Sequence, residues 1–146
     1  MQYRGAVPQL VNALKDEEWV CFSALEALTH LREECSVAHI VTLLDSPSEA
    51  LRFAAIEALG NISSPLAAGP LTAHVPKTEG YEKRATIISL VQIGDIPSSQ
   101  DVSGELIEML KDGEWEEKYA AIKGLVMLKE VEALYYMVDL AGSLDL

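Results

Sequence analysis

Apolar residues recur along this chain at helical spacing, and one short amphipathic helix returns four times. The copies share a leucine that stands in the same place in each: Leu28, Leu59, Leu90 and Leu125. Successive leucines lie 31, 31 and 35 residues apart. A further apolar residue follows each leucine three positions later, so the buried stripe continues at the period of an α-helix. The pattern predicts four related helices.

A second, shorter amphipathic segment precedes each of these helices. Its apolar positions are clearest before the first, second and fourth copies: Val7, Leu10, Val11 and Leu14; Ile40, Val41, Leu43 and Leu44; Leu106, Ile107, Met109 and Leu110. The third, around residues 66–75, is interrupted by Gly69 and Pro70. Short turn-forming linkers join the segments, and no strand-like alternation of useful length occurs. The chain is therefore predicted to be all-α and built from helix pairs.

Helix pairs that repeat at this period cannot bury their apolar faces alone, so stacking of neighbouring pairs supplies the core. The predicted pairs span about residues 6–34, 36–62, 65–94 and 102–129, and residues 130–140 are the first helix of a partial fifth pair. Small residues on the second helices, such as Ala24, Ala55 and Ala121, allow close helix packing. We expect residues 1–146 to form a single solenoid domain.

Two neighbouring segments carry a family resemblance. Residues 43–47 end a first helix in an Asp-Ser-Pro turn, and residues 51–60 open a second helix with Leu51-Arg52 and run through small residues to Leu59-Gly60. This pattern resembles the short HEAT-like repeats of the phycobilisome-lyase type, over about residues 6–129. The resemblance implies a right-handed α-α superhelix, or α-solenoid, of about four HEAT-like helix pairs plus a terminal helix. It also implies an ion pair between Asp45 and Arg52.

One exposed stripe of the second helices carries the candidate binding residues. Positions six and two before each leucine, and two after it, share this stripe, because four residues make about one helical turn. In HEAT-like stacks the second helices line the concave surface, so the stripes are expected side by side. The candidate partner-binding residues are Phe22, Glu26, Phe53, Glu57, Arg84, Tyr119 and Lys123, and His30 and Asn61 continue the first two columns. Aromatic residues and arginine are enriched at binding hot spots.

A structural role for the same aromatic residues is the alternative. Phe22, Phe53 and Tyr119 would then pack against neighbouring repeats and complete the core. Trp19 and Trp115, which open second helices, are weaker binding candidates, and we expect ordinary packing of both at the edges of the repeats.

The charge of the chain narrows the class of partner. Lysine and arginine number 11 against 23 aspartates and glutamates, so the net charge is −12. No basic tract is present to neutralise phosphates, so nucleic acid and anionic membranes are not expected as partners. The start of the chain lacks a secretory signal pattern, and no run of about eighteen apolar residues occurs. We expect a cytoplasmic protein that binds a protein partner or a neighbouring domain of a longer chain.

The chain offers little that resembles catalytic or metal-binding chemistry. Cys21 and Cys35 are expected to be free thiols. A helix N-terminus can lower a thiol pKa, but we expect Cys21 to be a small surface or semi-buried residue. The group His30, Glu33, Glu34 and Cys35 is best explained as solvated loop residues. Neither a nucleophile motif nor a phosphate-binding glycine loop is found. We therefore predict no cofactor, no metal and no enzymatic activity.

These observations favour a non-catalytic interaction or scaffold module that binds a partner segment on its concave face. Because the family resemblance includes lyase subunits, the alternative is an accessory subunit of a bilin (tetrapyrrole) lyase or a chaperone-like enzyme, with Phe53, Arg84 and Tyr119 around the pigment. A purely structural spacer is the third possibility. The apolar helix at residues 130–140 also indicates a longer array, or a homodimer through this C-terminal helix.

Overall fold

Every regular element that the structure describes is a helix. The structure is a computed structural model, and it describes residues 4–128, 138–140 and 142. Within these residues no strand is present, which confirms the all-α prediction. The chain divides into two units, Met1–Ile93 and Gly94–Leu146, which are described in turn. That residues 1–146 form a single domain stays a prediction.

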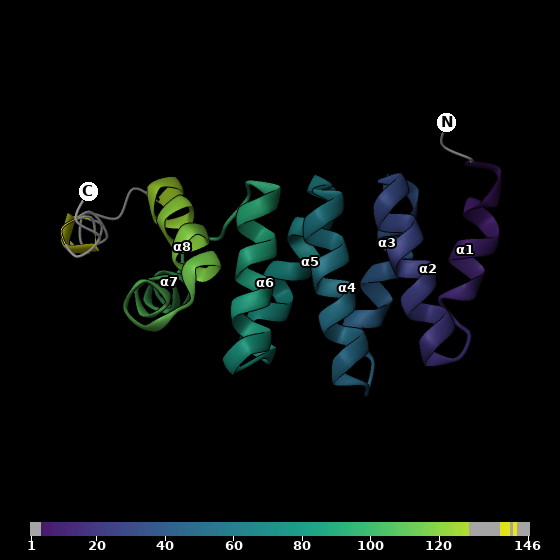
Figure 1. Cartoon of the computed structure of the whole chain (residues 1–146), viewed down its shortest axis with the longest axis horizontal. Helices are drawn as coiled ribbons and strands as arrows, with labels where there is room; N and C mark the ends of the chain where they lie inside the picture. The colour runs from purple at the N-terminus through teal and green to yellow at the C-terminus, as the bar shows by residue number, and fades with distance from the viewer. Residues whose placement is uncertain (1–3, 129–137, 141, 143–146) are drawn as a thin grey trace. The chain divides into compact units, whose positions relative to one another are not determined.

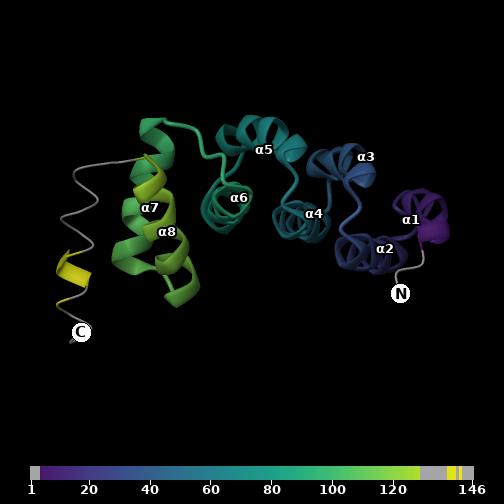
Figure 2. The same cartoon turned by 90° about the horizontal axis from the view of Figure 1, so that it is seen from above.

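Three helix pairs make up the first unit. Its second helices lie side by side in one layer: α2 (Glu18–Leu31), α4 (Glu49–Ile62) and α6 (Gly80–Ile93) (Figures 1 and 2). The first helices are α1 (Val7–Ala13), which packs against α2, and α3 (Val37–Val41) and α5 (Ala68–His74), which form the other layer. Short 3₁₀ helices flank them: η1 (Arg4–Ala6), η2 (Glu34–Ser36), η3 (Thr42–Asp45), η4 (Pro65–Ala67) and η5 (Val75–Lys77).

The second helices are regular because the repeat specifies both their length and their end. Each of α2, α4 and α6 has 14 residues. Arg32 and Ser63 follow α2 and α4 with φ of 53° and 58°, and Gly94 follows α6 with φ of 87°. These three positions are 31 residues apart in sequence. A left-handed residue ends a helix by redirecting the chain, and glycine adopts that conformation at the least cost.

The core of the first unit follows the repeated leucines. Leu28, Leu59 and Leu90 are fully buried, and so are Ile56 and Ile87 on the same helices. The first helices contribute buried residues that face this layer, including Ile40 and Leu71. The amphipathic pattern of the sequence is therefore the pattern of burial.

Polar side chains connect successive repeats at a separation of 30 residues. Ser48 Oγ donates to Glu18 Oε1 at 2.5 Å, and Ser64 Oγ donates to Glu34 Oε1 at 2.7 Å. Arg52 Nε donates to Glu82 Oε1 at 3.0 Å. Each bond joins residues from two different helix pairs, so the polar contacts reinforce the stacking that the apolar core begins.

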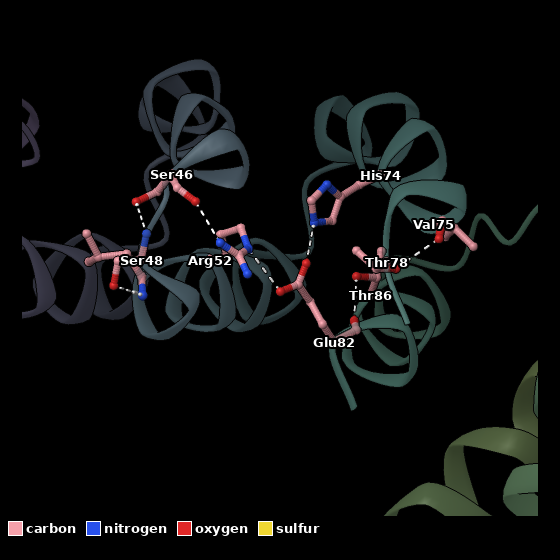
Figure 3. Close-up of polar contacts among 9 residues, drawn as sticks. Ser46, Ser48, Arg52, His74, Val75, Thr78, Glu82 and Thr86 are labelled. Carbon is pink, nitrogen blue, oxygen red and sulfur yellow. Dashed lines mark hydrogen bonds and ion pairs between the residues drawn. The ribbon is translucent and has the colours of Figure 1, made fainter. Parts of the chain in front are cut away.

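The expected ion pair between Asp45 and Arg52 is not formed. Arg52 Nη1 instead donates to the Ser46 carbonyl at 2.8 Å, while its Nε reaches Glu82 on α6. Glu82 lies between two partners, because its other oxygen is 3.2 Å from Nε2 of the buried His74 (Figure 3). The arginine therefore joins its own turn to the next repeat, where the resemblance predicted a pair within one repeat.

The second unit contains one more helix pair, α7 (Gln100–Asp112) and α8 (Trp115–Leu128), which pack on each other. Ser99 caps α7 by accepting a hydrogen bond from the Val102 amide at 3.2 Å. Leu106, Met109 and Leu125 are buried in this pair. Most of the predicted fifth helix, residues 130–140, lies outside the described residues, although residues 138–140 are helical.

Candidate functional site

A cavity of about 330 Å³ lies between α2 and α4. We call it the α2–α4 groove, and its lining residues are Phe22, Leu25, Glu26, Thr29, His30, Ala54, Glu57, Ala58 and Asn61. The structure thus brings together Phe22, Glu26 and Glu57 of the candidate binding stripe. His30 and Asn61, which continue the two columns, also line the groove.

The groove is a consequence of which residues meet between α2 and α4. At the next interface, Gly60 of α4 lies against Ser89 and Gln92 of α6, so close that a Cβ at Gly60 would overlap both side chains. The residues at the corresponding positions 31 earlier are Thr29, Ala58 and Asn61. Thr29 stands where α4 has Gly60, so its side chain keeps α2 and α4 further apart. Ala58 stands where α6 has Ser89, so a smaller side chain faces the space between them.

Hydrogen bonding differs between the two interfaces in the same way. Ser89 Oγ donates across the α4–α6 interface to the Ile56 carbonyl at 2.8 Å. At the corresponding place in α2, the Leu25 carbonyl accepts from Thr29 Oγ1 of its own helix at 2.7 Å. Ala58, which corresponds to Ser89, has no hydroxyl to donate across the α2–α4 interface.

The groove combines apolar walls with two carboxylates. Leu25 and Ala58 are buried, and Phe22 and Ala54 are half-buried and face the cavity. Glu26 and Glu57 are exposed, and neither forms a hydrogen bond or an ion pair with another residue of the described chain. An aromatic ring, an aliphatic wall and two uncompensated negative charges therefore share one cavity.

Phe53 and Arg84 are placed differently from the groove residues. Both are half-buried, Phe53 on α4 and Arg84 on α6, and neither lines the cavity. Phe53 stands on α4 at the position that corresponds to Phe22 on α2, 31 residues earlier in the sequence. Half-burial means that Phe22 and Phe53 each pack on a neighbour and also present part of the ring to solvent.

Tyr119 and Lys123 form a patch of their own on α8 in the second unit. The Lys123 ammonium lies 5.6 Å from the centre of the Tyr119 ring, which is a cation–π distance. Tyr119 is 61% exposed, so it does not complete the core. A stripe that runs through all seven candidate residues stays a prediction, and so does a pigment pocket made from Phe53, Arg84 and Tyr119.

The expectation that Trp19 and Trp115 pack at repeat edges is wrong. They are 68% and 73% exposed, at the starts of α2 and α8. The Trp19 indole donates to Glu17 Oε2 at 3.2 Å. Tyr81, which is 77% exposed at the start of α6, is a further aromatic residue of this kind. Its position nine residues before Leu90, like Trp19 before Leu28, is the sequence signal that identifies it.

Cys21 and Cys35 are both free thiols with different surroundings. Cys21 is 1% exposed, so the expectation of a surface or semi-buried residue is wrong, and burial, assisted by the negative charge of Glu18, raises its pKa. The helix N-terminus therefore does not activate this thiol. Cys35 is exposed, and its Sγ contacts Glu33 Oε2 at 3.8 Å. In the part of the chain that the structure describes, no group of three or more His, Cys, Asp and Glu side chains is arranged to hold a metal ion.

Comparison with protein families identifies the fold. Residues 7–91, more than half of the chain, match the family model of HEAT repeats. The chain belongs to the HEAT repeat family, and the matched residues run from the start of α1 into the last turn of α6. No curated protein matches the chain. Among the described residues, no helix combines the length and the apolar character needed to span a membrane.

Proposed function

We propose that this HEAT repeat chain is a non-catalytic protein-interaction module and that its α2–α4 groove holds a segment of the partner. The observation that carries the proposal is the groove itself. It places the half-buried ring of Phe22 beside two carboxylates, Glu26 and Glu57, that have no partner among the described residues. Cavities lined by apolar walls with a few polar groups are the usual form of binding sites.

The closed α4–α6 interface supports a binding role for the open one. If packing between repeats were the only requirement, a glycine and serine like Gly60 and Ser89 would close the α2–α4 space as well. An aromatic side chain left half-exposed in a cavity gains free energy when a ligand covers it, because apolar surface leaves water. The groove therefore offers a partner segment a favourable contact that the chain itself does not use.

The partner in this proposal is a protein or a neighbouring domain. The net charge of −12 repels nucleic acid and anionic membrane surfaces. The proposed setting is the cytoplasm, and the repeats would be of the phycobilisome-lyase type. Association through residues 130–140, with a further repeat or a second copy, is a separate part of the proposal, and most of these residues lie outside the described set.

Affinity capture from a lysate of the source cells tests the groove as a binding site. The natural chain is compared with Ala54→Trp, which fills the groove, and with Ala73→Trp, which adds the same side chain to an exposed position on α5. Circular dichroism and thermal melting establish that all three are folded. We expect one protein to be retained by the natural chain and by Ala73→Trp and lost from Ala54→Trp. Retention by all three chains, or by none, would overturn the proposal.

A further inference from the structure

We infer that the α2–α4 groove is a cation site, which takes the arginine or lysine side chain of the partner segment. This inference rests on the proposed function and names the chemistry of the partner. Glu26 and Glu57 stand at the same position of successive repeats and line one cavity from neighbouring helices. Two like charges that share a groove repel each other, and a cation between them relieves the repulsion.

Among the described residues, no lysine or arginine lines this groove. Its only basic lining residue is His30, which is exposed on the rim, and no ion pair joins either glutamate to another described residue. The contrast is a second cavity of about 390 Å³, lined by residues that include Arg52, Lys77 and Glu82. There the carboxylate of Glu82 is already held by Arg52 and His74. Of these two cavities, the α2–α4 groove is therefore the one whose carboxylates lack a positively charged partner.

The shape and walls of the groove suit a long side chain with a charged end. Arginine and lysine have an apolar stem, which can pack on Leu25 and Ala58, and a cationic head. The ring of Phe22 offers that head a cation–π contact. The volume, about 330 Å³, is at the small end of the range for ligand pockets, so it suits one side chain rather than a helix.

Arginine fits the pair of carboxylates better than lysine does. Its planar guanidinium donates along two edges and can contact Glu26 and Glu57 together, whereas an ammonium acts as a point charge. His30 and Asn61 lie one helical turn beyond the two glutamates and line the same cavity. They can donate to, and accept from, the peptide groups that flank the inserted side chain. The acidic chain as a whole attracts a basic segment and speeds its approach.

Displayed peptide libraries provide the test. Four libraries of twelve-residue peptides are random except for one fixed central residue, which is Arg, Lys, Gln or Glu. Each is selected against the full chain, against Glu26→Gln/Glu57→Gln, and against Glu79→Gln/Glu116→Gln. The last variant removes the same net charge at two exposed glutamates outside the groove. Peptides recovered from each library are also measured against Ala54→Trp.

The inference predicts that the Arg library yields the strongest binders and the Lys library the next. Their affinity should fall about tenfold or more in the groove variant, as expected for loss of a charge-assisted contact, and should persist in the control variant. Binders that depend on an open groove but show no preference for Arg or Lys would overturn the cation site and leave the interaction module standing. If no library yields a binder that Ala54→Trp weakens, both proposals fail.

Discussion

Ser89 on α6 donates its hydroxyl to the carbonyl of Ile56 on α4, across a distance of 2.8 Å. A side chain reaches the backbone of the neighbouring helix in this way only where the two helices approach closely. Gly60, one turn beyond Ile56, makes the approach possible because it has no Cβ. The corresponding interface between α2 and α4 lacks both the glycine and the serine, and it is there that the candidate groove lies.

Gly60→Ala is expected to destabilise the first unit by about 1–3 kcal/mol, since the added methyl group overpacks a tight interface. The new Cβ would lie 2.6 Å from Ser89 Oγ and 2.9 Å from Ser89 Cβ. Gly69→Ala is the matched control, because nothing lies within 4 Å of a Cβ there. Urea unfolding measures both variants. Equal stability of the two would show that the α4–α6 contact is not the constraint described.

Glu82→Gln is expected to lower the free energy of unfolding by about 1–3 kcal/mol, because hydrogen bonds to a charged group are the stronger kind. The change keeps the size of the side chain but removes the charge that faces Arg52 and His74. Glu79→Gln, an exposed position nearby, should change stability by less than about 0.5 kcal/mol. The idea that Arg52 joins two repeats through Glu82 is lost if both variants unfold alike.

Arg32→Gly is expected to stabilise the chain by up to about 1 kcal/mol, because glycine adopts the left-handed conformation without steric cost. Arg32 has φ of 53° after α2, where the corresponding residue after α6 is already Gly94. Arg32→Ala serves as the control, since alanine meets the same steric cost as arginine. Thermal melting of the three proteins tests the expectation, and no gain over Arg32→Ala would contradict it.

Cys35 is expected to react with a thiol reagent rapidly and Cys21 only slowly in the folded chain. Cys35 is exposed, whereas Cys21 is 1% exposed and its pKa is raised by burial and by Glu18. A reagent that changes absorbance on reaction gives both rates at neutral pH. Comparable rates in the natural chain would contradict the described burial of Cys21.

The raised pKa of Cys21 also predicts a loss of stability in alkaline solution. Below the ordinary thiol pKa of 9.0 the thiol is neutral in both states, so its full contribution is present. Above that value the unfolded chain releases the proton while the folded chain retains it, so stability falls as the pH rises. The difference in unfolding free energy between the natural chain and Cys21→Ala should therefore shrink from pH 7 to pH 10. A constant difference would argue against the shift.

Local features of this fold were predictable from sequence, and contacts between repeats were not. The leucines that define the repeat, such as Leu28 and Leu59, are buried. Their burial could be predicted because helical periodicity is a property of each segment alone. The choice of Glu82 over Asp45 as the partner of Arg52 depends on a residue 30 positions away. The exposure of Trp19 likewise depends on which edges meet.

The candidate site shows the same division. Helical spacing placed Phe22, Glu26 and His30 on one face, and the repeat placed Glu57 and Asn61 beside them, as the groove lining shows. Nothing in that spacing distinguishes an open interface from a closed one. The distinction comes from the contact between Gly60 and Ser89, which becomes visible only when the helices are packed.

Photo-crosslinking in the source cells can show whether the α2–α4 groove holds a protein partner. A photoreactive phenylalanine derivative is placed at His30, on the rim of the groove, and in a second chain at His39, an exposed position on α3. We expect a crosslinked protein from position 30 that is absent from position 39 and is lost when Ala54→Trp fills the groove. Crosslinks of equal yield at both positions, or at position 39 alone, would contradict it.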